Sequence, residues 1–138
     1  MSGLEWKLKE QLIWLRIGVF VSGTVVMALE ILGSRILAPS YGNSIFVWGS
    51  LIGVVLTGLS SGYYLGGRLA DKNPSFKIFS SIIFSAGIYV ILIPFLSPYT
   101  LETSLALDFD DRYGPLFTTT ILLAPPSIIL GMVSPLCC

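Results

Sequence analysis

The sequence predicts an all-α integral membrane protein, a bundle of four transmembrane helices with both termini in the cytoplasm. Three observations support this fold class. The 138 residues are 54% hydrophobic and only 12% charged, the mean hydropathy is +0.83, and the apolar residues gather in long uninterrupted stretches. Because soluble domains carry about 25% charged residues, this composition excludes an ordinary soluble globular protein.

The composition also excludes several functional classes. Eight basic residues balance eight acidic ones, so the chain offers no basic surface for a nucleic acid. Histidine is absent, which removes the most frequent general base and metal ligand. We therefore expect a protein that is not an enzyme and that has no cofactor and no metal site. The acidic residues near 108–111 are interpreted as a solvated loop rather than a Ca²⁺ or Mg²⁺ site.

The two cysteines, Cys137 and Cys138, are adjacent and cannot build a disulfide framework. We interpret them as part of a hydrophobic terminus. Lipidation from the cytoplasmic side is the alternative, and it is less favoured because the chain does not end in a prenylation pattern.

Four stretches are long enough to cross a membrane, because a bilayer core about 30 Å thick needs about 20 apolar helical residues. We expect these spans at approximately residues 13–34, 44–67, 78–101 and 115–136, within a single membrane domain that covers residues 1–138. Pro39 is expected to end the first helix. Residues 1–12, with a leucine at every fourth position from Leu4 to Leu12, are expected to form a short helix in the membrane interface.

The distribution of Lys and Arg sets the orientation. The N-terminal segment and the second loop together carry six basic residues, whereas the first and third loops carry only Arg35 and Arg112. By the positive-inside rule, the N-terminus, the second loop and the C-terminus lie in the cytoplasm. The chain is thus expected to be a multi-pass protein of the cell membrane.

The second span is rich in small residues, which let membrane helices approach each other closely. Gly49 and Gly53 form one row with Thr57 and Ser61, and a second row contains three glycines. That second row consists of Gly58, Gly62 and Gly66. At 100° per residue the two rows lie on different sides of the helix, which predicts a central helix with neighbours on both sides.

The fourth span contains Pro125 and Pro126 in mid-membrane. These two prolines remove two backbone donors and disfavour the helical conformation at Ala124, so we expect a kink or a break there. Such breaks line substrate sites in some transporters, but we favour a role in helix packing.

Glu30 is the only acidic residue within a predicted span. Ionisable groups in lipid are costly, so they usually carry a function or form a structural pair. Two hypotheses stay open with equal weight: Glu30 couples transport to protons or cations, or it forms an ion pair with Arg35 near the outer boundary.

Several segments resemble a known family. They are MALEILGSRILAP at residues 27–39, YGNS at 41–44, VWGS at 47–50, GYYLGGRLAD at 62–71 and GMVSP at 131–135. Together they look like the membrane portion of fused major-facilitator/spermidine synthase proteins, over most of the chain. The resemblance implies a transporter-like module for cationic or polyamine solutes.

Residues 67–72 further resemble the major-facilitator signature GxLADR between that superfamily's second and third helices. This resemblance implies that Gly67, Arg68, Asp71 and Lys72 belong to a gating motif that contacts neighbouring helix ends. No segment of these 138 residues resembles the aminopropyltransferase domain of the fused proteins, so we keep three hypotheses. They are a transporter-like module, an accessory subunit of a larger membrane complex, and a membrane anchor for a separate aminopropyltransferase-like enzyme. We expect a homo-oligomer or a larger membrane-protein complex in the lipid bilayer.

Overall fold

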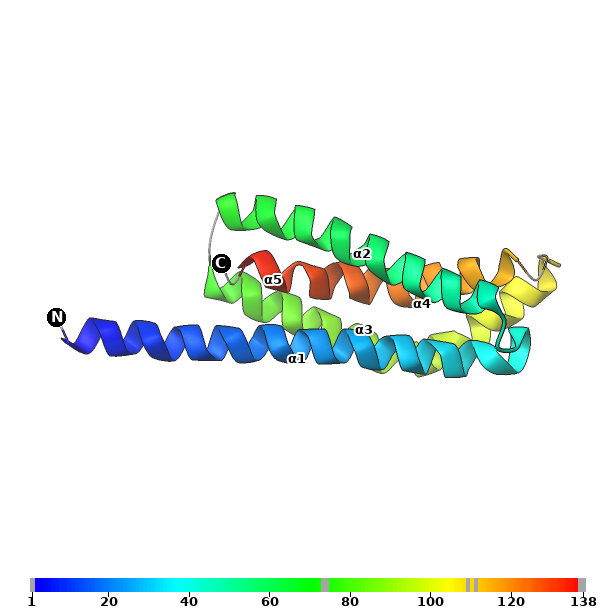
Figure 1. The fold of residues 1–138 in the computed structure, drawn as a ribbon, viewed down its shortest axis with the longest axis horizontal. Coiled ribbons are helices and arrows are strands. Elements are labelled where there is room, and N and C mark those ends of the chain that lie inside the picture. The colour runs from blue at the N-terminus through cyan, green and yellow to red at the C-terminus, as the bar shows by residue number, and fades with distance from the viewer. Residues whose placement is uncertain (1, 73–74, 109, 111, 137–138) are drawn as a thin grey trace.

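The computed structural model describes residues 2–72, 75–108, 110 and 112–136, and every regular element in these ranges is a helix. The elements are α1 (Ser2–Tyr41), α2 (Ile45–Lys72), α3 (Phe76–Ala106), α4 (Gly114–Gly131) and the short α5 (Val133–Leu136). Consecutive long helices run antiparallel (Figure 1), so α2 and α4 are parallel to each other. The beginnings of α1 and α3 lie at the same end of the bundle as the ends of α2 and α5.

Four helices are long and apolar enough to cross a membrane, which confirms the expected number of such helices and the all-α class. The qualifying segments are Gly3–Tyr41, Ile45–Lys72, Lys77–Ala106 and Gly114–Pro135. The first three extend beyond the expected spans, because helical structure continues past the apolar stretches into charged flanks. Large apolar side chains, among them Phe20, Leu56 and Phe95, are exposed on these helices.

The first helix differs from the expectation at both ends. Residues 2–12 do not form a separate helix but continue into the first span as one helix of 40 residues, which projects beyond the rest of the bundle (Figure 1). Pro39 does not end the helix, which continues to Tyr41. A proline removes only its own N–H, and the Gly42 N–H still donates to the Ala38 carbonyl over 2.9 Å. The helix ends where Gly42 adopts a positive φ of 70°, a conformation that glycine adopts at little cost.

The central helix is α4 rather than α2, so this part of the packing prediction is wrong. α4 contacts α1, α2 and α3, whereas the main neighbours of α2 are α4, α5 and α1. The core around α4 is apolar and includes Leu122, Leu123 and Leu130 with Leu37 and Leu51. Two small-residue faces on α2 are therefore compatible with a peripheral helix, because only one of them packs closely against another helix in the described residues.

The face of α2 that packs is the row Gly58, Gly62 and Gly66. A Cβ atom built on Gly58 would lie 2.8 Å from Ser127 Cβ, one on Gly62 would lie 2.9 Å from Gly131 Cα, and one on Gly66 would lie 2.7 Å from Pro135 Cγ. The three glycines, spaced four residues apart on α2, thus contact three residues with the same spacing on α4 and α5, Ser127, Gly131 and Pro135. Two parallel rows in register bring the backbones into contact, which is how membrane helices associate through small residues.

The other predicted packing glycines have no partner within the described part of the chain. A Cβ atom on Gly49 or Gly53 would meet nothing within 4 Å, and both residues are exposed.

The chain stays helical through Pro125 and Pro126, since α4 extends from Gly114 to Gly131. The expected break is therefore absent, whereas a kink at these prolines stays a prediction. Pro125 cannot donate to the carbonyl four residues earlier, that of Ile121. The Tyr89 hydroxyl of α3 donates to this carbonyl instead, over 2.9 Å. A side chain from the neighbouring helix thus replaces the missing backbone donor, which is one way in which membrane helices tolerate proline.

Candidate functional site

Glu30 and Arg35 do not form an ion pair in the structure. Glu30 is half-buried on α1 beside the core residue Leu29, and Arg35 is exposed one and a half turns further along. No nitrogen of Arg35 lies within 4.0 Å of a Glu30 oxygen in the described chain. The hypothesis of a structural pair therefore has no contact to support it, and Glu30 remains a half-buried carboxylate inside an apolar helix.

The motif at the end of α2 is exposed. Arg68 lies over the ring of Tyr64, one turn earlier on the same helix, with 5.1 Å between the guanidinium carbon and the ring centroid. Asp71 and Lys72 are exposed, and Gly67 has open space where a Cβ would be. Among the described residues, no hydrogen bond or ion pair joins Arg68, Asp71 or Lys72 to a neighbouring helix, and residues 73 and 74 lie outside the described part. A gating role for Gly67, Arg68, Asp71 and Lys72 stays a prediction.

A cluster of hydroxyl groups joins three helices at the opposite end. Ser104 Oγ of α3 donates to the Leu101 carbonyl over 3.0 Å and accepts a hydrogen bond from Thr118 of α4 over 3.3 Å. Because the single proton of Ser104 is engaged, the Tyr41 hydroxyl of α1 donates to Ser104 Oγ, 2.5 Å away. This cluster was not predicted from the sequence. A weak signal for it is that all three hydroxyl residues lie near helix ends on the same predicted side of the membrane.

The bundle interior offers no continuous polar path among the described residues. Most of the buried side chains are apolar, and the cavity enclosed by α1, α3 and α4 has a volume of only about 10 Å³ with Leu29, Ile93 and Leu122 in its wall. A water molecule needs about 10–15 Å³ and two to four polar partners, so this space stays dry. The buried hydroxyl oxygen of Ser127 has no hydrogen-bond partner in the described chain, but it lies in the α2–α4 contact and lines none of the described cavities.

The exposed small-residue row of α2 forms one wall of a groove. We call Gly49, Gly53, Thr57 and Ser61 the outer row. Three of its members line a groove of about 300 Å³ whose other wall is α4, with Thr120 and Ile128. Thr57 and Ser61 donate to the carbonyls of Gly53 and Thr57 over 2.7 and 2.8 Å. The outer row thus consists of small side chains whose hydroxyl groups already donate to carbonyls of α2. Such a surface lets a second membrane helix pack closely against α2.

Other residues named from the sequence lie outside the described chain. These are Asp111 of the acidic loop and the adjacent Cys137 and Cys138. Asp108 and Asp110 are exposed, as expected of a solvated loop.

No family model, curated protein or solved structure matches this chain. The resemblance to the membrane portion of fused major-facilitator/spermidine synthase proteins therefore stays a prediction.

Proposed function

We propose that this chain is a non-catalytic membrane module that functions in assembly with further transmembrane helices, either second copies of itself or another membrane protein. The outer row of α2 carries the proposal. The chain builds its own tightest helix contact from the inner row of the same helix, Gly58 to Gly66, and leaves a second row of equal spacing without a partner in the described chain. Five glycines spread over two faces exceed what one packing partner requires.

The apolar surface of the bundle supports the proposal that lipid surrounds this module. Four helices have the necessary length and hydropathy, and large apolar side chains such as Ile45, Phe84 and Ile91 are 69–80% exposed. Contiguous apolar surface of this kind is rare on soluble monomers, whereas lipid tails solvate it well.

The proposed orientation places the beginning of α1 and the end of α5 in the cytoplasm. The end of the bundle where α1 and α3 begin holds Lys7, Lys9, Arg68, Lys72 and Lys77, with Arg16 further into α1, whereas the opposite end holds Arg35 and Arg112. This asymmetry follows the positive-inside rule, and residues 107–113 then face outward.

Assembly is tested by replacing Gly53 with leucine. Both Gly53→Leu and the control Gly23→Leu have open space at the Cβ position, so the monomer is expected to fold in both. We expect the unmodified chain, purified in a mild detergent and reconstituted in nanodiscs, to carry a second copy or another membrane protein. Gly53→Leu should lose this partner and Gly23→Leu should keep it. Recovery of the unmodified chain as a monomer without any membrane-protein partner would contradict the proposal.

Transport of cationic or polyamine solutes is a second candidate function, favoured by one observation. Glu30 is half-buried in an apolar helix without an ion pair in the described chain, which is the environment of many coupling carboxylates. Because the single bundle encloses no polar path among its described residues, the solute path would form in the assembly. Proteoliposomes should then show pH-sensitive uptake that Glu30→Gln abolishes without loss of stability, and an absence of Glu30-dependent uptake would exclude this function.

A further inference from the structure

Three consecutive residues of α2 have three different surroundings. Thr57 belongs to the outer row. Gly58 follows it by 100° about the helix axis and packs against α4, where a Cβ atom would lie 2.8 Å from Ser127 Cβ. Leu56 precedes Thr57 by 100° on the side away from α4, and its side chain is 57% exposed. The outer row therefore has a protruding leucine on one side and α4 on the other.

A groove lies between the outer row and α4. We call it the α2–α4 groove. Its volume is about 300 Å³, and it is lined by Thr57 and Ser61 of α2 with Ala124 and Ile128 of α4. The outer row thus separates a hollow from a protruding side chain, Leu56. Such a surface is complementary to a partner that presents the same two features in the opposite order.

A second copy of the chain presents these features in the opposite order. Copies in one membrane share the orientation that their charges impose, so a two-fold axis between them is perpendicular to the membrane and the two α2 helices run parallel. In a two-fold contact, residue i meets residue j of the partner while j meets i. The outer rows then meet each other, and Leu56 of each copy faces the α2–α4 groove of the other. Rotation about this axis preserves depth, so Leu56 stays level with Thr57 of the other copy.

The chain already contains a contact between two parallel rows of small residues. The inner row of α2 packs against Ser127, Gly131 and Pro135, which are spaced four residues apart on helices parallel to α2. The outer row has the same spacing, so α2 of a second copy offers the outer row a partner of this kind. α2 carries no charged residue before Arg68, so no like charges oppose each other where two outer rows meet.

We propose that two copies associate through a two-fold contact of their α2 helices, in which Leu56 of each copy fills the α2–α4 groove of the other. This inference rests on the assembly proposed above and names its partner as a second copy of the chain.

Aromatic side chains mark both ends of the contact. Phe46 and Tyr64 lie within 20° of Thr57 about the axis of α2, and Arg112 and Arg68 lie over their rings, with 5.6 and 5.1 Å to the centroids. From Phe46 to Tyr64 the helical rise amounts to about 27 Å, close to a hydrocarbon core about 30 Å thick. Helices that pack through such glycine rows cross at about −40°. They separate toward both ends of the contact, which leaves room for the rings.

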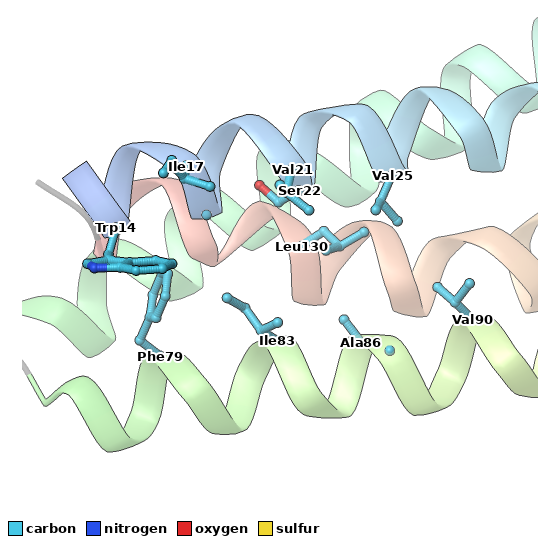
Figure 2. A pocket seen from close by; sticks show the side chains of 12 residues that line it. Trp14, Ile17, Val21, Ser22, Val25, Phe79, Ile83, Ala86, Val90 and Leu130 are labelled. Carbon is cyan, nitrogen blue, oxygen red and sulfur yellow. The ribbon is translucent and has the colours of Figure 1, made fainter. Parts of the chain in front are cut away.

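The larger groove, between α1 and α3, suits a second copy less well. Phe79 and Ile83 of α3 project into it toward α1 (Figure 2). The ring of Phe79 reaches α1, where a Cβ atom on Gly18 would lie 3.1 Å from its Cζ atom. Large side chains keep a second helix at a distance from this surface, whereas the glycines of the outer row permit backbone contact.

The test is cross-linking between two differently tagged copies that are expressed together and kept in their membrane. Cys137 and Cys138 are replaced by serine in both copies. One copy carries Leu56→Cys and the other carries Ile128→Cys, in the α4 wall of the groove. The control pair combines Leu56→Cys with Phe84→Cys, at an exposed position of α3. A bifunctional methanethiosulfonate with a propyl spacer links the thiols, and the composition of the complex without cross-linker is measured separately in nanodiscs.

We expect Leu56→Cys to link to Ile128→Cys several-fold more than to Phe84→Cys. Gly53→Leu in both copies should lose this excess, and Gly23→Leu should retain it, with circular dichroism to show that both variants are folded. Equal linking of the two pairs while the nanodiscs hold two copies would overturn the two-fold contact and leave the proposed assembly intact. A complex with a different membrane protein in place of a second copy would do the same. A monomer without any partner in the nanodiscs would contradict both proposals.

Discussion

The contact between α2 and α4 makes a sharp prediction at Gly62, where the two backbones touch. A Cβ atom at this position would meet the Ile128 carbonyl oxygen, and it would lie 2.9 Å from Gly131 Cα and 3.1 Å from the Gly131 carbonyl carbon. All of these are backbone atoms, so no side-chain rotation can relieve the overlap. Gly62→Ala therefore forces the two helices apart along their whole contact.

The expected loss of stability in Gly62→Ala follows from a comparison with Gly53→Ala on the same helix. Replacing glycine by alanine within a helix gains about 1 kcal/mol of intrinsic propensity, and this gain is common to both variants and cancels. Overpacking costs about 1–3 kcal/mol. Since the obstacle at Gly62 is backbone, we expect the upper part of this range, so Gly62→Ala should be less stable than Gly53→Ala by about 2–3 kcal/mol.

The measurement is the free energy of unfolding in mixed micelles, followed by circular dichroism during an SDS titration. Gly53 has open space at its Cβ position, so Gly53→Ala should be at least as stable as the unmodified protein. Equal stability of Gly62→Ala and Gly53→Ala would show that the rows of α2 and α4 are not in contact, and it would refute the packing described above.

Three further predictions concern hydrogen bonds and the charged pair. Tyr89→Phe should destabilise the protein by about 0.5–1.5 kcal/mol. The loss should be smaller in a Pro125→Ala background, because the backbone there regains an N–H that can donate to the Ile121 carbonyl. An equal loss in both backgrounds, measured in the same SDS titration, would contradict the role assigned to Tyr89. Tyr41→Phe should cost about 1 kcal/mol through the lost bond to Ser104, and an unchanged unfolding midpoint would argue against this cluster. Glu30→Gln and Arg35→Ala should each stay within about 0.5 kcal/mol of the unmodified protein, whereas a loss of folded yield in both would restore the hypothesis of a structural ion pair.

The number and approximate positions of the helices could be predicted from the sequence because they depend on local properties. Uninterrupted apolar stretches of sufficient length mark each helix, whereas the charged flanks of the first three stretches, which were expected outside the spans, continue the helices. Their ends were less predictable: α1 continues through Pro39 because a proline in the last turn removes one donor, while the residues after it still donate. The interfacial segment likewise joined the first span, since nothing between residues 12 and 13 breaks a helix.

The arrangement of the helices could not be predicted in the same way. Glycine spacing shows which faces of α2 permit close approach, but it does not show which helix approaches them. The partner row on α4 and α5, from Ser127 to Pro135, includes a serine and a proline and was not recognised as small residues in register. As a consequence, α2 was placed at the centre in place of α4.

The effect of Pro125 also depended on tertiary contact. Its missing donor predicted a kink or a break, and the replacement donor that accompanies the continuous helix, Tyr89, is 32 residues away from Ile121 in sequence. Among the candidate site residues, Glu30 was predicted to lie within a helix and does so, whereas its ion pair with Arg35 is absent in the described chain. Long polar side chains on a helix adopt several orientations, so sequence spacing alone does not fix such a pair.

Sided labelling in sealed vesicles is the most direct test of whether lipid surrounds the four long helices. Cys137 and Cys138 are replaced by serine, and Lys72→Cys and Asp110→Cys are introduced separately. With a membrane-impermeant maleimide, Lys72→Cys should react only from the cytoplasmic side and Asp110→Cys only from the outer side. Reaction of both positions from the same side of the vesicle would contradict the account, because α3 lies between them and would then not cross the bilayer.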